Sequence, residues 1–96
     1  MKKAFWIAKY KKINSQEALS KYAEMAKKII ETFGGKALVR GGKYITLEGE
    51  DYIRTVIWEF ENIDIAIKCH DSNAYQEAWS LAKNTTVRDL LIVEGV

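Results

Sequence analysis

Residues 33–42, Phe33-Gly34-Gly35-Lys36-Ala37-Leu38-Val39-Arg40-Gly41-Gly42, decide the fold of this chain. Glycine readily adopts positive φ and lets two backbones approach closely. The first glycine pair predicts the end of a helix, with Gly34 as the left-handed residue after it. Residues 36–40 predict a strand. The second pair predicts a hairpin turn or a bulge in one long strand, and the good turn at 49–51 favours the bulge, with residues 43–48 continuing the strand.

The segment before these glycines reads as a strand followed by a helix. Residues 4–10 are rich in aromatic and branched side chains, which is typical of a strand. Asn14 is the predicted N-cap, because Glu17 follows three residues later in a capping-box pattern. The helix then runs to about Phe33. Its apolar face, at helical spacing, is predicted to be Ala18, Tyr22, Met25, Ala26, Ile29 and Phe33.

The segment after the glycines repeats this order, a strand followed by helix, and ends in a further strand. Residues 54–61 predict a strand, and Asn62 caps a short helix with Ile63, Ala66 and Ile67 inward. Residues 71–73 break that helix, and Ser72 or Asn73 caps the next one. Its inward face is predicted to be Tyr75, Ala78, Trp79 and Ala82. Residues 87–94 form the last strand. The order β-α-β-β-α-β predicts one α+β domain over residues 1–96, a ferredoxin-like antiparallel sheet with its helices on one face.

Three of the predicted strands are apolar on both faces. This holds for residues 4–8, 56–58 and 90–93, whereas a sheet with one wet face alternates apolar and polar residues. Both helical segments of this topology cover the same face, so nothing in the chain covers the other one. An exposed apolar sheet is an aggregation hazard. We therefore expect a homodimer in which two sheets pack face to face, burying roughly 1,200–2,000 Å² or more.

Composition excludes several functional classes. The 96 residues carry a net charge of +2, too small to indicate a nucleic-acid or membrane partner. The single cysteine, Cys69, excludes an internal disulfide. The apolar run near the N-terminus has only five residues, too few for a signal peptide or a membrane span, so a cytoplasmic protein is expected. The sequence contains no phosphate loop, dinucleotide fingerprint or zinc ligand set, and no cofactor or metal is predicted.

A set of short motifs spread along the chain resembles the domain of unknown function 1330 family, in the dimeric α/β-barrel group. They are Phe5-Trp6-Ile7-Ala8, Gly34-Gly35, Arg40-Gly41-Gly42, Leu47-Glu48-Gly49, Arg54, Glu59-Phe60, Asp71-Ser72, Tyr75 and Val93-Glu94-Gly95. Their order and spacing carry the resemblance, which covers nearly the whole chain. It implies a ferredoxin-like fold and a homodimer, and it brings no established reaction.

The chain departs from the family pattern at three places. Cys69-His70 stands where the family usually has an aromatic pair, and Asn73 where it commonly has proline. The family's arginine in the later helix is replaced near Ala82 and Lys83. Lys83 lacks the bidentate geometry of a guanidinium, which weakens any ligand site that the resemblance implies.

Arg40 and Arg54 are the leading candidates for ligand binding. Each lies at a strand end near a glycine turn, where a guanidinium can bind a carboxylate or phosphate bidentately. The alternative is a salt bridge with Glu48, Glu59 or Glu94 across the sheet.

Four further residues are candidates for a site. Ser72 lies at the helix break, where free backbone N–H groups favour an anion, and its simplest role is a cap. Tyr75 offers a hydroxyl, and Glu59 a carboxylate that is either paired or turned to a ligand. His70, the only histidine, is the one candidate for a general acid or base.

These observations predict a domain that binds a small anionic or aromatic organic molecule in a pocket between sheet and helices. Two alternatives stay open. One is a structural or ligand-sensing dimer without chemistry, and the other is a cofactor-free oxygenase or isomerase, suggested by the fold group alone.

Overall fold

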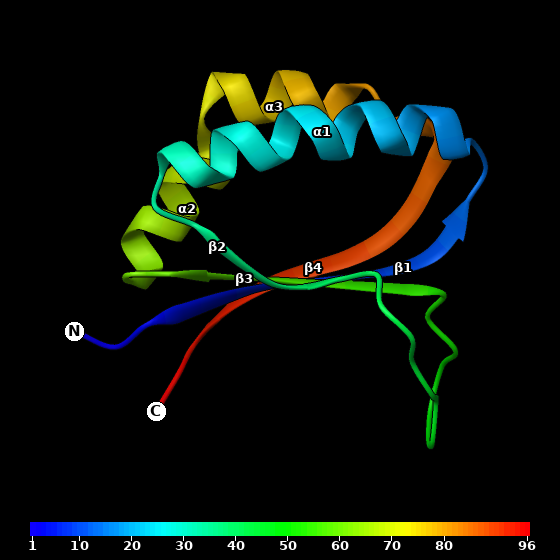
Figure 1. Cartoon of the computed structure of the whole chain (residues 1–96), viewed down its shortest axis with the longest axis horizontal. Helices are drawn as coiled ribbons and strands as arrows, with labels where there is room; N and C mark the ends of the chain where they lie inside the picture. Colours follow the sequence, from blue (N-terminus) through cyan, green and yellow to red (C-terminus); the bar gives the residue numbers. More distant parts are fainter.

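The computed structural model describes all 96 residues and shows a four-stranded antiparallel sheet with three helices on one face (Figure 1). The strands lie in the order β2-β3-β1-β4, as a ferredoxin-like fold requires. No helix is long and apolar enough to cross a membrane. The elements are β1 (Ala4–Ile13), α1 (Gln16–Thr32), β2 (Lys36–Arg40), β3 (Arg54–Phe60), α2 (Ile63–Asp71), α3 (Asn73–Ser80), the 3-10 turn η1 (Lys83–Thr85) and β4 (Thr86–Glu94). The predicted fold class is thus confirmed.

The two faces of the sheet differ in burial, although both are apolar. Along β1, the residues that face the helices are buried, among them Trp6, Ala8 and Tyr10. The alternate residues Phe5 and Ile7 lie on the opposite face and are only half-buried. We call this opposite side the open face. The chain places no helix over it (Figure 1).

The start of α1 differs from the prediction by one residue. Ser15, not Asn14, is the N-cap, and its hydroxyl accepts a hydrogen bond from the Ala18 amide. Asn14 lies between β1 and this cap, and its amide donates to the Thr85 carbonyl of η1 at 2.7 Å.

The buried face of α1 is also rotated from the predicted one. Its core positions are Leu19, Tyr22, Ala26 and Ile30, whereas Met25 is 44% exposed. Tyr22 and Ala26 belong to both the predicted and the observed face of α1, so helical spacing alone did not distinguish the two faces.

The glycine pair after α1 has two separate tasks. Gly34 has φ of 79°, and its amide bonds to the Glu31 carbonyl, which confirms the left-handed residue after the helix. Gly35 lies against Ile30 and Phe60. A Cβ there would clash with the Ile30 side chain and lie 2.9 Å from its carbonyl oxygen. Gly35 therefore lets the chain pass close to the helix end on its way into β2.

The second glycine pair ends β2 instead of bulging it. Gly41, with φ of 70°, donates its amide to the Thr55 carbonyl, and the chain then leaves the sheet. Residues 41–53 form a projecting loop, which we call the arm, and residues 43–48 pair with no strand (Figure 1). The predicted strand at 43–48 is therefore wrong. The register does shift within β2, but between Ala37 and Val39.

The second helical segment follows the prediction in most respects. Asn62 caps α2 by accepting from the Ile65 amide, and Ser72 caps α3 by accepting from the Tyr75 amide. In α2 the buried residues are Ala66 and Cys69, whereas Ile67, predicted inward, is 43% exposed. In α3 the inward face has its fully buried residues at Tyr75 and Ala78.

Candidate functional site

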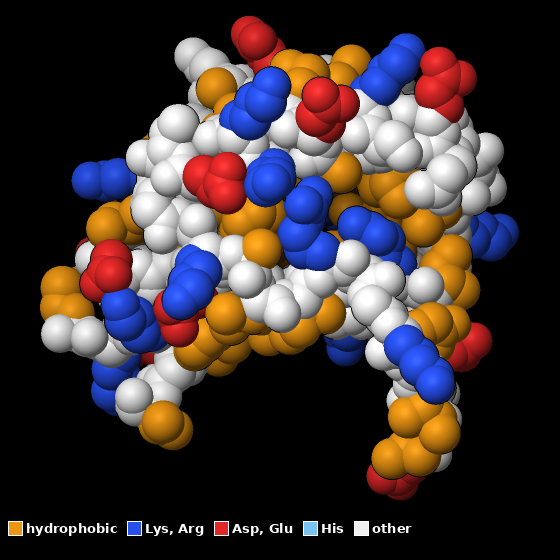
Figure 2. All heavy atoms as spheres, in the orientation of Figure 1, with side chains coloured by type: hydrophobic (Ala, Val, Ile, Leu, Met, Phe, Trp, Pro, Cys, Tyr) orange, Lys and Arg blue, Asp and Glu red, His pale blue; other side chains and the backbone are white.

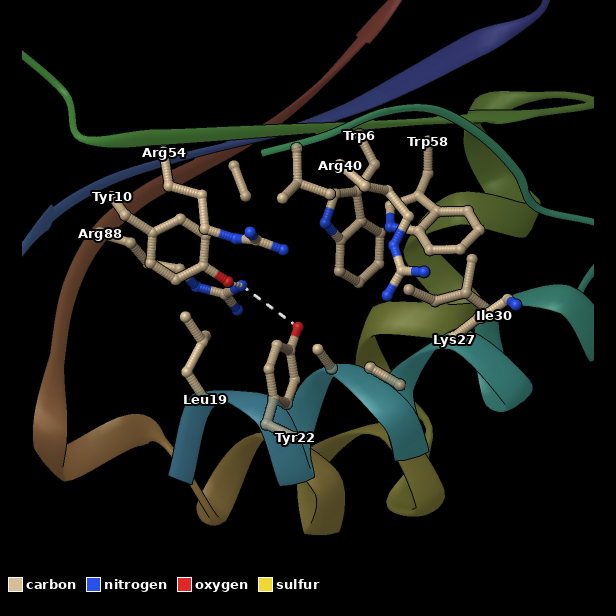
Figure 3. A pocket seen from close by; sticks show the side chains of 14 residues that line it. Trp6, Tyr10, Leu19, Tyr22, Lys27, Ile30, Arg40, Arg54, Trp58 and Arg88 are labelled. Atoms are coloured by element: carbon tan, nitrogen blue, oxygen red, sulfur yellow. Dashed lines mark hydrogen bonds between the residues drawn. The ribbon is translucent and has the colours of Figure 1, made fainter. Parts of the chain in front are cut away.

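A cavity lies between α1 and the helix-facing side of the sheet (Figure 3). Its free volume is about 20 Å³, enough for about one water molecule. Fourteen residues line it, of which ten are hydrophobic. The remaining four are all basic, and they are Lys27, Arg40, Arg54 and Arg88. No histidine, cysteine or acidic residue lines it.

The register of the sheet explains why the arginines meet. Tyr10 of β1 pairs with Arg54 of β3 on one side and with Arg88 of β4 on the other. Side chains of directly paired residues lie on the same face, so these three form one row across the sheet. Arg40 of β2 pairs with Val56, two residues after Arg54, and adds a third guanidinium. These are all the arginines in the chain.

Arg88 is held by a group of tyrosines. Its Nη1 donates to the hydroxyls of Tyr10 and Tyr22, at 3.2 Å each, and its Nη2 donates to the Tyr75 hydroxyl at 2.9 Å. The guanidinium also stacks on Trp79, with its carbon 3.6 Å from the ring centroid. The charge is thus fixed by neutral oxygens and an aromatic face, and no carboxylate neutralises it.

These contacts set the ionisation of the group. Burial raises the pKa of Tyr10, Tyr22 and Tyr75, so their hydroxyls stay protonated. Burial alone would lower the pKa of Arg88, but the tyrosine oxygens outweigh it, and the pKa lies above its ordinary value. The oxygens of Tyr22 and Tyr75 are 2.6 Å apart, so one hydroxyl donates to the other. Either of these two hydroxyls can be the donor of that bond, whereas the Tyr10 hydroxyl accepts from Arg88 and keeps its own proton for a ligand.

Arg54 is less completely bonded than Arg88. Its Nε is buried and has no hydrogen-bond partner, and its guanidinium points into the cavity (Figure 3). The side chain lies against the backbone of Gly41, where an added Cβ would clash with Nη1 and come within 2.8 Å of the guanidinium carbon. Gly41 thus supplies the positive φ and leaves room for the guanidinium in this position, and a Cβ there would displace the end of the Arg54 side chain.

Arg40 and Lys27 lie at the exposed mouth of the cavity. The guanidinium carbon of Arg40 is 5.7 Å from the ring centroid of Trp58, whereas Lys27 projects from α1. Basic side chains gather between α1 and the sheet on the face shown in Figure 2. The site is thus positive from its mouth to its base.

None of the three arginines forms a salt bridge, so the predicted alternative of pairing with Glu48, Glu59 or Glu94 is wrong. Uncompensated cations in a partly desolvated space favour an anion, and guanidinium groups bind carboxylates and phosphates bidentately. The lining offers N–H and O–H donors, but no imidazole, carboxylate or thiol that accepts a proton. The arrangement suits the binding of an anion better than acid–base chemistry.

The other predicted site residues lie elsewhere. Glu59 is on the open face, opposite Phe5 of β1. Ser72 caps α3 and does not reach the cavity. Tyr75 contributes indirectly, because its hydroxyl holds Arg88 from behind. His70 binds the Asp71 carboxylate at 2.9 Å and borders a separate shallow groove beside β4.

Arg88 and Tyr10 are the main cavity residues that the sequence analysis missed. A signal was present, because Arg88 lies two and four residues before Leu90 and Ile92. Residues at this spacing share one strand face. A charged residue in phase with the inward side of a strand indicates a buried polar site.

The profile of a domain of unknown function (DUF1330) matches residues 3–96. The chain belongs to this family. None of the curated proteins matches the sequence. Membership in DUF1330 agrees with the sequence resemblance and with the fold, and it brings no reaction with it.

Solved structures share the DUF1330 chain's fold at low sequence identity. A protein of unknown function from Rhodopseudomonas palustris is 16% identical, with a TM-score of 0.77, over 99% of this chain and 83% of that one. A dimeric protein of unknown function and ferredoxin-like fold from Bacteroides fragilis is 14% identical, with a TM-score of 0.65, over 97% and 96%. SnoaB, a cofactor-independent oxygenase from Streptomyces nogalater, is 9% identical, with a TM-score of 0.67, over 99% and 94%. These likenesses show the fold alone.

Proposed function

We propose that this DUF1330 domain is a cytoplasmic homodimer that binds a small organic anion in the cavity under α1. One observation carries the proposal. All three arginines of the chain line this cavity, and no carboxylate neutralises them. Like charges gathered in a partly desolvated space without a carboxylate destabilise a fold, and arrangements of this kind occur where function needs them.

The aromatic side chains of the cavity indicate what kind of group the anion carries. Trp6, Trp58 and Tyr10 offer aromatic surface beside the guanidinium groups. An aromatic or other flat carboxylate would bring an anion to Arg54 and Arg88 and a ring to these side chains. The free volume of about 20 Å³ is too small for such a molecule. Binding therefore requires Lys27 and Arg40 at the mouth to swing outward.

The open face supports the dimer. Leu91 and Val93 of β4 are 51% and 46% exposed, next to the half-buried Phe5 and Ile7 of β1. An apolar sheet face of this kind calls for a cover, and a second copy supplies one by two-fold symmetry. The dimeric state of the Bacteroides fragilis protein is consistent with this arrangement.

The oxygenase or isomerase alternative finds less support in the cavity. Such reactions need a group that accepts a proton from the substrate. Tyr10 and Tyr22 are held protonated by burial, and His70 lies outside the lining. A purely structural dimer is disfavoured as well, because it has no use for three arginines gathered without a carboxylate partner. Binding without catalysis remains the best-supported function.

Thermal unfolding in the presence of small anions tests this proposal. Benzoate, phosphate and acetate are compared at fixed ionic strength and fixed protein concentration. Ligand at 100 times its Kd adds about 2.7 kcal/mol of stability, and each kcal/mol raises Tm by about 4–8 °C in a domain of this size. The variant with Arg40→Met and Arg54→Met should lose the saturable increase. The charge-matched control with Lys28→Met and Lys68→Met should keep it, and equal losses in both would overturn the proposal.

A further inference from the structure

The arm, residues 41–53, carries the most exposed apolar side chains outside the chain ends. Leu47 is 82% and Ile45 79% exposed, and Tyr44 and Ile53 are 51% and 44% exposed. Single exposed apolar residues are common on protein surfaces. Four of them within ten residues of one projecting loop mark an interaction surface.

The arm is fixed in place at its base. The Tyr52 hydroxyl donates to the Asp89 carboxylate at 2.8 Å, and Lys11 lies 3.6 Å from the same carboxylate. Within the arm, the Thr46 hydroxyl donates to the Asp51 carboxylate at 2.6 Å. Such bracing pre-organises an apolar surface, which lowers the entropy lost when it binds a partner.

The direction of the arm indicates that its partner lies on the open face of the sheet. It leaves the sheet on the side opposite the helices, so it and the apolar open face border the same hollow (Figures 1 and 2). Stacked sheets lie about 10 Å apart, and a leg of about six residues reaches at most about 20 Å. The arm is therefore long enough to pass beside a second sheet stacked on the open face.

The area of the open face is compatible with a second copy of the chain as the partner. Four strands about 4.8 Å apart and about seven residues long cover roughly 450 Å² in plan. Two such faces give roughly 900 Å² in plan, which is a lower bound on the accessible surface buried between them, and apolar arms on both copies would enlarge this contact.

We infer that the arm of each copy packs against a second copy of this chain, whose sheet covers the open face. The inference rests on the proposed homodimer and extends it to a second contact, made by Ile45 and Leu47. Because the contact is two-fold symmetric, each substitution in the arm changes two equivalent contacts of the dimer.

Sedimentation equilibrium of the full chain tests the arm. The variant with Ile45→Ser and Leu47→Ser should keep its circular dichroism spectrum and dissociate with a Kd raised at least about 100-fold, because four apolar side chains leave the interface. The control with Met25→Ser and Leu81→Ser removes two apolar side chains of the helical layer that are also exposed, at 44% and 42%, and should leave Kd unchanged.

Two outcomes would overturn the inference in different ways. If the arm variant dimerises as tightly as the unmodified chain, while Leu91→Glu on the open face dissociates it, the dimer stands and the arm contact is wrong. If the unmodified chain is a folded monomer throughout, both the proposed dimer and the arm contact are wrong.

Discussion

Replacing Arg54 by methionine should stabilise the protein and weaken anion binding at the same time. The buried Nε of Arg54 has no hydrogen-bond partner, and no carboxylate balances its charge. Methionine fills a similar volume without a polar atom. The unliganded protein then no longer contains a polar group that is satisfied only when a ligand is bound. Such groups lower stability and are kept for function.

The structure bounds the size of the gain. A buried polar atom without a partner costs about 1–3 kcal/mol. The Arg54 side chain is only half-buried, and water reaches part of its guanidinium, so the low end applies. We expect the free energy of unfolding to rise by about 1 kcal/mol and Tm by about 4–8 °C.

Urea denaturation at one fixed protein concentration measures both effects, since unfolding of a dimer depends on concentration. The first series contains chloride as the only added anion, and the second adds benzoate at the same ionic strength. Benzoate should stabilise the unmodified protein more than the Arg54→Met variant. Lys28→Met removes one exposed charge from α1 outside the cavity and should change neither the stability nor the benzoate effect.

The reasoning is refuted if Arg54→Met lowers the stability in chloride and leaves the benzoate effect intact. Arg54 would then stabilise the fold by packing, and the anion would bind elsewhere.

Three other experiments test the open face, the two glycines with positive φ and the buried thiol. Leu91→Glu places a charge on the apolar open face and should convert the dimer to monomers or unfold it, which light scattering with circular dichroism distinguishes. Gly41→Ala and Gly34→Ala should each cost about 1 kcal/mol because both glycines have positive φ, but only the former should weaken benzoate binding, since its Cβ displaces Arg54. Burial raises the pKa of Cys69 to about 12, so a disulfide reagent at pH 8 should label this thiol only after unfolding. The free energy of unfolding should fall as the pH rises above about 9, because only the thiol of the unfolded chain ionises there.

The order of the elements was predictable because local signals mark their ends. Gly34 stops α1, and Asn62 and Ser72 each cap the helix that follows. Such signals act within a few residues, so a single sequence contains them. The fold class follows from their order.

The arm was not predictable in the same way. Tyr44, Thr46 and Leu47 form a stretch with ordinary strand propensity. Whether such a stretch becomes a strand depends on a neighbour with free backbone groups. β2 already occupies the edge of β3, and Gly41 turns the chain away, so no partner remains in this copy.

The site was half predictable. Arg40 and Arg54 stand out beside glycine turns. The prediction that Ser72 lies near them was wrong, because local signals do not show at which end of the sheet each residue lies. Ser72 follows α2, which begins after the Phe60 end of β3, whereas Arg54 begins that strand (Figure 1). Arg88 meets Arg54 only through the register with Tyr10. Long-range register is not written in local spacing.

A side-chain NMR titration tests the central claim most directly. The chain has only three arginines, so three Nε–Hε signals report on the whole cavity, and each is assigned by its Arg→Met variant. With benzoate at constant ionic strength, we predict that the signals of Arg54 and Arg88 shift together and saturate with one Kd. Arginine signals that stay unchanged, or drift linearly without saturation, would contradict an anion-binding cavity under α1.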